Sequence, residues 1–256
     1  MMNIDTKPLV SVITPAYNSE RFIGETIDSV LAQTLEDWEM IIVDDCSTDR
    51  TFEIIKRYAA KEPRIKARRL SENSGAAIAR NEAIRQSRGR YIAFLDSDDQ
   101  WFPEKLEVQL DFMKENNAIF TFTNYCYVNE QGEGTGKVSS TPSSVNYTDL
   151  LKQNMIGCLT VMIDKNKAGP IEMVNIRTRQ DYVLWLSLCK KGIRAQGLSQ
   201  VLSKYRVVQN SVSSDKYKMA KQNWRVYRKI EKLSLLKSVW YFANYIFFKV
   251  KKYSTL

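Results

Sequence analysis

The chain has 256 residues, of which 44% are hydrophobic and 26% charged, an ordinary composition for a folded domain that excludes wholesale disorder. It contains no histidine, which excludes Ser-His-Asp triads, Cys-His pairs and histidine-ligated zinc, and leaves carboxylates as candidate general bases. Its charge is uneven, because residues 1–189 hold 22 basic and 27 acidic residues, whereas residues 190–256 hold 16 basic and 2 acidic residues.

Strands and helices are predicted to alternate through the first part of the chain. Apolar runs rich in β-branched residues predict strands within residues 9–18, 40–43, 65–70 and 91–95. Apolar residues at helical spacing predict helices within 19–34, 50–61 and 75–89, with Ser47 as a candidate N-cap of the second. This order predicts an α/β fold with a mostly parallel sheet and helices on its faces.

Polar residues follow these strands at the point where each strand ends. In open parallel sheets, ligands bind outside the carboxyl ends of the strands. We therefore expect one group of side chains to converge on that rim: Asn18, Asp44, Asp45, Asp96 and Asp98.

The segment "DSDD" (residues 96–99) is the densest group of carboxylates at this rim. Burying such like charges without a cation is costly, and Mg²⁺ or Mn²⁺ held by one or two carboxylates and by substrate phosphates fits this pattern. The alternative is a capped turn before a helix that Pro103 would start. The chain has no dinucleotide-binding or P-loop glycine motif, so any phosphate at this site is expected to bind through a metal.

Five segments in order resemble the successive motifs of family 2 glycosyltransferases, which are inverting enzymes with the GT-A fold. They are "VSVITPAYN", "IIVDDCSTD", "SGAAIARN", "GRYIAFLDSDD" and "RQDYVLWLSL". The resemblance runs from Val10 to Gly192 and implies a Rossmann-like nucleotide-diphospho-sugar transferase. It implies a catalytic domain over residues 1–205, with a nucleotide-sugar-binding half (1–100) and an acceptor-binding half (101–205). A closing loop and a basic amphipathic helical tail would follow over residues 206–256.

The resemblance also implies which residues bind the donor sugar nucleotide. The implied donor-binding positions are Pro15, Ala16, Tyr17, Asn18, Asp45, Arg80, Asp96, Ser97 and Asp98, with Asp45 facing the base. Asp98 would be the metal ligand, with Asp96 a second candidate. Further candidates are Asp44 as a structural partner, Asp99 as a helper or a helix cap, Trp101, Gln180, Arg206 and Ser211. Arg80 has an alternative reading as a surface arginine on a helix.

Asp181 is the candidate catalytic base. Helical spacing places it on one stripe with Leu184, Trp185 and Leu188, and a carboxylate on an apolar stripe is unusual unless it has a task. The alternative is an aspartate that stabilises a helix N-terminus. The resemblance assigns the base to this position, although the family usually has Glu-Asp where this chain has Gln180-Asp181.

The segments after the motifs give weaker indications. The loop near Tyr205, Arg206, Ser211 and Ser213 resembles one that closes over the donor, and residues 157–161 would lie near the acceptor or form another buried strand. The apolar run at residues 238–248 is too short to span a bilayer. We expect the tail to lie on an anionic membrane surface. Nucleic-acid binding and a solvated helical hairpin packed on the body are the alternatives.

The expected function is inverting transfer of a hexose or N-acetylhexosamine from a UDP-sugar, with Mn²⁺ or Mg²⁺. The expected acceptor is a polyprenyl-diphosphate-linked saccharide for O-antigen or capsule, at the inner face of the cytoplasmic membrane. The four cysteines have no paired spacing and no signal segment begins the chain, which favours a reducing compartment. The alternatives are a catalytically silent assembly partner that binds nucleotide sugar or membrane, and a metal-dependent phosphohydrolase.

Overall fold

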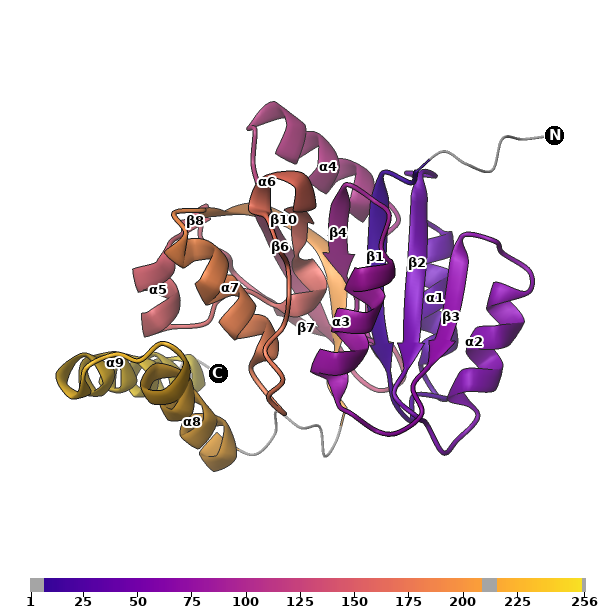
Figure 1. Ribbon diagram of the computed structural model, residues 1–256. Coiled ribbons are helices and arrows are strands. Elements are labelled where there is room, and N and C mark those ends of the chain that lie inside the picture. Colours follow the sequence, from indigo (N-terminus) through magenta and orange to yellow (C-terminus); the bar gives the residue numbers. More distant parts are fainter. Residues whose placement is uncertain (1–6, 209–215, 255–256) are drawn as a thin grey trace.

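The computed structural model describes residues 7–208 and 216–254 (Figure 1). Its first part alternates strands and helices as predicted, in the order β1 (Val10–Ala16), α1 (Ile23–Leu31), β2 (Trp38–Asp44), α2 (Thr51–Ala59), β3 (Ile65–Arg69), α3 (Ala76–Gln86) and β4 (Tyr91–Phe94). Strands β3, β2, β1 and β4 lie side by side in that order and are parallel. This part confirms the predicted α/β arrangement.

The second part of the chain adds antiparallel strands to the same sheet. Its elements are β5 (Gln100–Trp101), α4 (Lys105–Glu115), β6 (Phe120–Val128), β7 (Gly134–Val138), β8 (Ser144–Val145), α5 (Tyr147–Lys152), a 3₁₀ turn (Cys158–Thr160), β9 (Met162–Asp164), α6 (Lys165–Ala168), α7 (Gln180–Lys190) and β10 (Ala195–Arg206). Strand β9 runs antiparallel to both β4 and β6, while β6 and β10 are parallel. The sheet is therefore mixed here, which the apolar runs alone did not indicate.

Two hydrophobic layers cover the two faces of the sheet. Alternate residues of each strand point to opposite faces, so Ile13 and Phe94 join the layer under α3 and α7, while Val12 and Leu95 join the layer under α1 and α4. Helices thus cover both faces, as predicted (Figure 1). Ser47 is not the N-cap of α2, because that helix begins at Thr51, whose backbone N–H is bound by the Asp49 side chain at 2.9 Å.

The C-terminal helices α8 (Lys216–Arg225) and α9 (Leu235–Ser254) pack on each other, with a π-helical turn (Val226–Ile230) between them, and α9 packs beside α5. The buried Tyr227 hydroxyl donates to the Leu151 carbonyl at 2.6 Å, and the Tyr147 hydroxyl donates to Glu231 at 2.6 Å. These contacts agree with a helical hairpin packed on the body.

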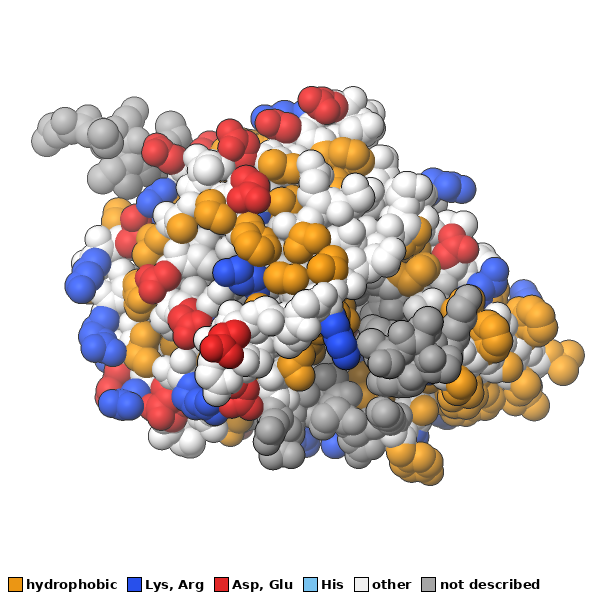
Figure 2. Space-filling view, turned by 180° about the vertical axis from the view of Figure 1, so that it is seen from behind, with side chains coloured by type: hydrophobic (Ala, Val, Ile, Leu, Met, Phe, Trp, Pro, Cys, Tyr) orange, Lys and Arg blue, Asp and Glu red, His pale blue; other side chains and the backbone are white. Residues whose placement is uncertain are grey.

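Hydrophobic side chains also gather on the surface at the lower right of Figure 2, where these helices lie. No helix within the described ranges is long and apolar enough to cross a membrane.

Lys105, at the start of α4, is fully buried with its ammonium nitrogen 3.8 Å from the centre of the Trp101 ring. Within the described residues this nitrogen has no hydrogen-bond partner, and burial lowers the pKa of Lys105 well below its ordinary value. Burying an unsatisfied polar group costs about 1–3 kcal/mol. The interior therefore carries a destabilising group at this position.

Lys105→Met is expected to raise the free energy of unfolding by about 1–3 kcal/mol, measured by urea denaturation. Lys114→Met on the same helix is the matched control, because Lys114 is exposed and should change stability little. Between the lowered pKa of Lys105 and its ordinary 10.5, the unfolded chain binds more protons than the folded chain. The stability of the wild type relative to Lys105→Met should therefore rise with pH in that window. A less stable Lys105→Met protein would contradict this.

Candidate active site

The loops that follow β1, β2 and β4 meet at one rim of the sheet, as the sequence predicted. The Asn18 backbone N–H donates to the Ser47 hydroxyl at 2.9 Å, which joins the first two loops. The hydroxyl oxygens of Ser19 and Ser97 lie 2.7 Å apart, which joins the first loop to the third. Residues separated by up to 78 positions are thus held in one small region.

The first loop offers side chains to a ligand at only two of its four predicted positions. Pro15 and Ala16 are buried within β1, and the Ala16 carbonyl accepts from the Asp45 backbone N–H at 2.8 Å. A direct role of these two residues in donor binding stays a prediction. Tyr17 is 48% exposed and Asn18 is also exposed, so both can reach a ligand.

The aspartate pair after β2 organises the neighbouring loops. Buried Asp44 accepts from the Ser47 backbone N–H at 3.1 Å and forms an ion pair with Arg69 at 3.2 Å. The two carboxylate oxygens of Asp45 accept from the backbone N–H groups of Ser74 and Gly75, at 2.7 and 2.8 Å. Asp45 therefore binds the N-terminal end of α3, a place where a helix favours negative charge. That Asp45 faces a nucleotide base stays a prediction.

The turn after β4 concentrates negative charge. Burial and the charge of Asp96 raise the pKa of Asp98 to about 6. Burial and the charges of Asp98 and Asp96 raise the pKa of Asp99 well above its ordinary value. Burial and the crowding of three carboxylates thus disfavour the charged forms of Asp98 and Asp99.

This donor set suits a divalent cation that arrives with a substrate. No three acidic or thiol side chains among the described residues come together in an arrangement that could hold a metal. Mg²⁺ and Mn²⁺ are commonly bound by one or two carboxylates, with phosphates and water completing the shell. The half-buried Asp98 and Asp96 fit that chemistry.

Asp99 and Trp101 both make contacts within the protein interior. The Asp99 carboxylate accepts from the Arg206 backbone N–H at 2.9 Å, and α4 begins only at Lys105, so Asp99 does not cap that helix. Trp101 lies in the short strand β5 and is buried, with its indole N–H donating to the Leu159 carbonyl at 2.8 Å. The reading of "DSDD" as a capped helix start was wrong because a strand follows the turn.

Arg80 pairs with a carboxylate of this turn. It is buried on α3, which rules out the reading as a surface arginine, and its guanidinium donates to an Asp96 oxygen at 2.5 Å. Burial alone would lower the pKa of Arg80, but the negative charges of Asp96 and, more weakly, Asp181 raise it. Its Nε and Nη1 atoms have no hydrogen-bond partner within the described ranges. Both atoms are buried, and buried donors normally have a partner.

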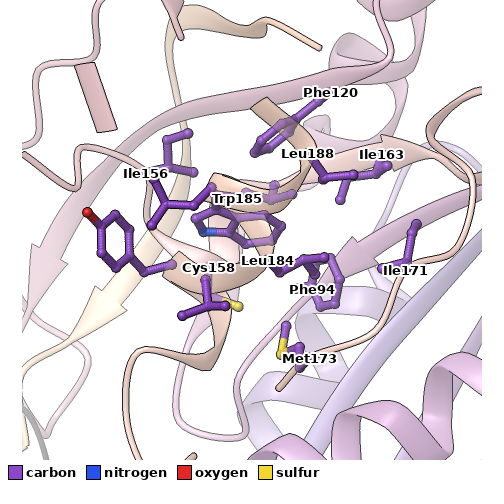
Figure 3. Packing of buried hydrophobic residues seen from close by; sticks show 14 of the residues in the cluster. Phe94, Phe120, Ile156, Cys158, Ile163, Ile171, Met173, Leu184, Trp185 and Leu188 are labelled. Carbon is purple, nitrogen blue, oxygen red and sulfur yellow. The ribbon is translucent and has the colours of Figure 1, made fainter. Parts of the chain in front are cut away.

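Helix α7 carries Asp181 in its first turn. The helix is buried on nearly every side, so the single apolar stripe predicted from the sequence is too narrow. Trp185 packs against Phe94 and Phe120, with ring centres 5.6 and 5.1 Å apart (Figure 3). Asp181 is half-buried, in contrast to the buried residues that follow it. The packing around Trp185 thus fixes the helix, while Asp181 keeps part of its surface exposed.

Two further candidates, Gln180 and Arg206, are buried. Gln180 is buried, and its side-chain oxygen has no partner in the part of the chain that the structure describes. Arg206 is the last residue of β10 and is buried, so it does not belong to a closing loop. Its side chain donates to the Asp98 carbonyl at 2.9 Å and pairs with Glu25 at 2.5 Å.

The other two candidates of the predicted closing loop, Ser211 and Ser213, lie outside the described residues.

Three further residues of the site were not found from the sequence. Ser19 joins two of the loops, Glu25 pairs with Arg206, and Cys158 is buried where its thiol interacts electrostatically with Arg80, Asp96 and Asp181. Burial raises the pKa of the Cys158 thiol. The segment 157–161 was predicted to lie near the acceptor, but nothing in its residue types indicated that Cys158 would lie beside the carboxylates.

Known proteins resemble this chain along most of its length. A family model described as glycosyl transferase family 2 matches residues 11–169. TuaG of Bacillus subtilis, whose name assigns it to teichuronic acid biosynthesis, is 53% identical over 246 residues, which cover 96% of this chain and 98% of TuaG. WfgD of Escherichia coli, named as a UDP-Glc:α-D-GlcNAc-diphosphoundecaprenol β-1,3-glucosyltransferase, is 40% identical over 248 residues, covering 96% of this chain and 95% of WfgD.

A solved structure shares the fold. TarS of Staphylococcus aureus, residues 1–349 in complex with UDP-GlcNAc, superposes with a TM-score of 0.72 at 25% identity. The match covers 86% of this chain and 64% of the TarS chain. The chain therefore spans less than two thirds of that structure.

Proposed function

The chain belongs to glycosyl transferase family 2, and on this premise we propose that it transfers a hexose or N-acetylhexosamine from a UDP-sugar to a polyprenyl-diphosphate-linked saccharide. The observation that carries the proposal is the contact between buried Arg80 and Asp96 in the carboxylate turn, with Asp181 near enough to help raise the pKa of Arg80. The activity in the printed name of WfgD supports the same donor and acceptor classes.

The donor would bind at the rim where the three loops meet. Tyr17 and Asn18 are exposed there and can contact the nucleoside, while Asp45 keeps the start of α3 in place. Ser97 is held by Ser19 beside the carboxylates. The unpartnered N–H groups of Arg80, counted within the described residues, suit the negatively charged or hydroxylated part of a sugar nucleotide.

Asp98, with Asp96 as a second candidate, would hold Mn²⁺ or Mg²⁺. A bound divalent ion supplies positive charge that stabilises the departing nucleoside diphosphate. The residues of this chain supply the rest of the arrangement. Arg80 fixes the orientation of Asp96, and Arg206 fixes the turn through the Asp98 carbonyl.

Asp181 would act as the general base. Its carboxylate accepts the proton of the acceptor hydroxyl while that oxygen attacks the anomeric carbon. The bond between the anomeric carbon and the phosphate oxygen breaks with its electron pair on the oxygen, and the configuration inverts. An α-linked UDP-sugar then gives a β-glycoside. The proposal includes a role in O-antigen or capsule repeat-unit synthesis at the inner face of the cytoplasmic membrane.

Thermal shifts with nucleotides test the donor site directly. We expect UDP with Mn²⁺ to raise the melting temperature of the purified protein more than UDP alone, and more than GDP or dTDP with Mn²⁺. A ligand at 100 times its Kd stabilises the folded state by about 2.7 kcal/mol, which such a measurement detects. A shift with another nucleotide would change the donor class. No shift with any nucleotide would contradict the proposal and favour a silent partner, and release of phosphate without sugar transfer would favour a phosphohydrolase.

A further inference from the structure

The outer face of α9 carries most of the exposed large hydrophobic side chains of the described chain. Seven of these side chains lie on this helix, namely Leu235, Leu236, Val239, Trp240, Ile246, Phe247 and Val250, and each is between 41% and 84% exposed. At 3.6 residues per turn, these positions fall on one face, which we call the α9 stripe. Hydrophobic side chains are visible in this part of the molecule in Figure 2.

The opposite face of α9 already has its partners within the chain. Ser238 and Tyr245 are buried, and Phe242 packs edge-on against Trp224 with ring centres 5.3 Å apart. The Arg179 guanidinium donates to the Tyr245 hydroxyl at 3.4 Å, which ties α9 to the start of α7. The helix is thus anchored on the body by one face, and the stripe does not take part in that anchoring.

The charge around the stripe indicates what can cover it. Residues 190–256 hold 16 basic residues against 2 acidic residues. Lys237 and Lys249 lie at the two borders of the stripe on the helix, where long side chains can place their ammonium groups beside lipid headgroups. A helix with an apolar face, basic borders and an aromatic residue such as Trp240 suits the interface of an anionic bilayer. The apolar side chains of this stripe would contribute nothing to recognition of nucleic-acid phosphates.

We propose that the α9 stripe seats on the surface of an anionic phospholipid bilayer, with α9 lying in the plane of the interface. This inference rests on the proposed function, because an enzyme held at the membrane would reach an acceptor that is anchored in that membrane. It also assigns the membrane contact to a defined face: the outer face of α9 inserts, and the inner face holds the catalytic body.

Co-sedimentation of the full chain with lipid vesicles tests the inference. We expect binding to vesicles that contain phosphatidylglycerol and much weaker binding to vesicles of phosphatidylcholine alone, with binding reduced by salt. The double variant Trp240→Ser, Phe247→Ser should bind anionic vesicles at least tenfold more weakly. The matched control is Val138→Ser, Val174→Ser, which changes two exposed hydrophobic residues outside the tail and should bind like the wild type.

A second pair of variants measures the contribution of the bordering lysines to vesicle binding separately from that of the apolar stripe. Lys237→Gln and Lys249→Gln should each weaken binding to anionic vesicles by about fivefold and leave binding to neutral vesicles unchanged. Equal vesicle binding by the wild type and by Trp240→Ser, Phe247→Ser would overturn the inference. So would a wild-type dimer in solution that the same double variant dissociates, because a second copy would then cover the stripe.

The vesicle experiment tests the membrane contact and the nucleotide experiment tests the donor site, so either proposal can be contradicted without the other. The stripe variants lie outside the donor rim, so UDP with Mn²⁺ should shift their melting temperature as it shifts that of the wild type. Vesicle binding without any nucleotide shift would contradict the proposed function and support the membrane contact of the α9 stripe. A nucleotide shift without vesicle binding would support the proposed function and contradict the membrane contact.

Discussion

Asp181→Asn is expected to lower the rate of sugar transfer by about two to four orders of magnitude, the usual contribution of a general base. Asparagine keeps the size of the side chain but does not accept a proton at neutral pH. Helix α7 should keep its place, because Trp185 and its buried neighbours hold it, and Asp181 is only half-buried. Arg80 retains its ion pair with Asp96 in this variant.

Donor binding distinguishes a lost base from a damaged site. The nucleotide thermal shift should be unchanged in Asp181→Asn, since the loops after β1, β2 and β4 are untouched. Asp111→Asn is the matched control, because Asp111 is an exposed helical aspartate whose side chain is 58% accessible. Wild-type transfer by Asp181→Asn would show that the base lies elsewhere. Loss of both transfer and the nucleotide shift would make Asp181 a structural residue.

Asp98→Asn is expected to abolish the part of the UDP thermal shift that depends on Mn²⁺, and to lower transfer by about a hundredfold or more. The reason is that charge stabilisation by a bound metal is worth several kcal/mol in the transition state. Without ligands, the variant should be at least as stable as the wild type, because it removes one of three carboxylates crowded into one turn. Binding of UDP and Mn²⁺, measured by calorimetry, checks the first expectation.

The combination of higher stability and lost binding is the diagnostic result for Asp98. A residue that merely supported the turn would lower the melting temperature when changed. The control is again Asp111→Asn, which carries the same chemical change on a surface helix. A metal-dependent UDP shift of wild-type size in Asp98→Asn would contradict the assignment and direct attention to Asp96.

The carboxylate rim could be predicted because its elements are local. Apolar runs such as Tyr91–Phe94 form strands, and the residues that follow must lie at the carboxyl ends of parallel neighbours. The prediction for Ser47 failed because α2 begins at Thr51, four residues later, where the Asp49 side chain accepts from the Thr51 backbone N–H. Trp101 was one of the candidate site residues, and its type gave no sign that its indole would find a carbonyl partner in the interior.

Contacts between distant residues could not be predicted in this way. Arg206 joins a turn that lies 108 positions earlier in the chain, and its neighbours along the sequence give no sign of that partner. Arg80 looks like an ordinary helical arginine until α3 is placed on the sheet, where it becomes buried beside Asp96. The burial of α7 on nearly every side likewise depends on β4 and β6 (Figure 3).

The sequence by itself determined the alternation of strands and helices, the chemistry of "DSDD" and the basic charge of the last quarter of the chain. These features depend on backbone periodicity and on residue type, which neighbours along the chain fix. Only the tertiary structure decided that β9 runs antiparallel, that Arg206 is buried and that the apolar face of α9 points outward. Those outcomes depend on which surfaces pack together, because burial and pairing are properties of contacts between segments that lie far apart in the chain.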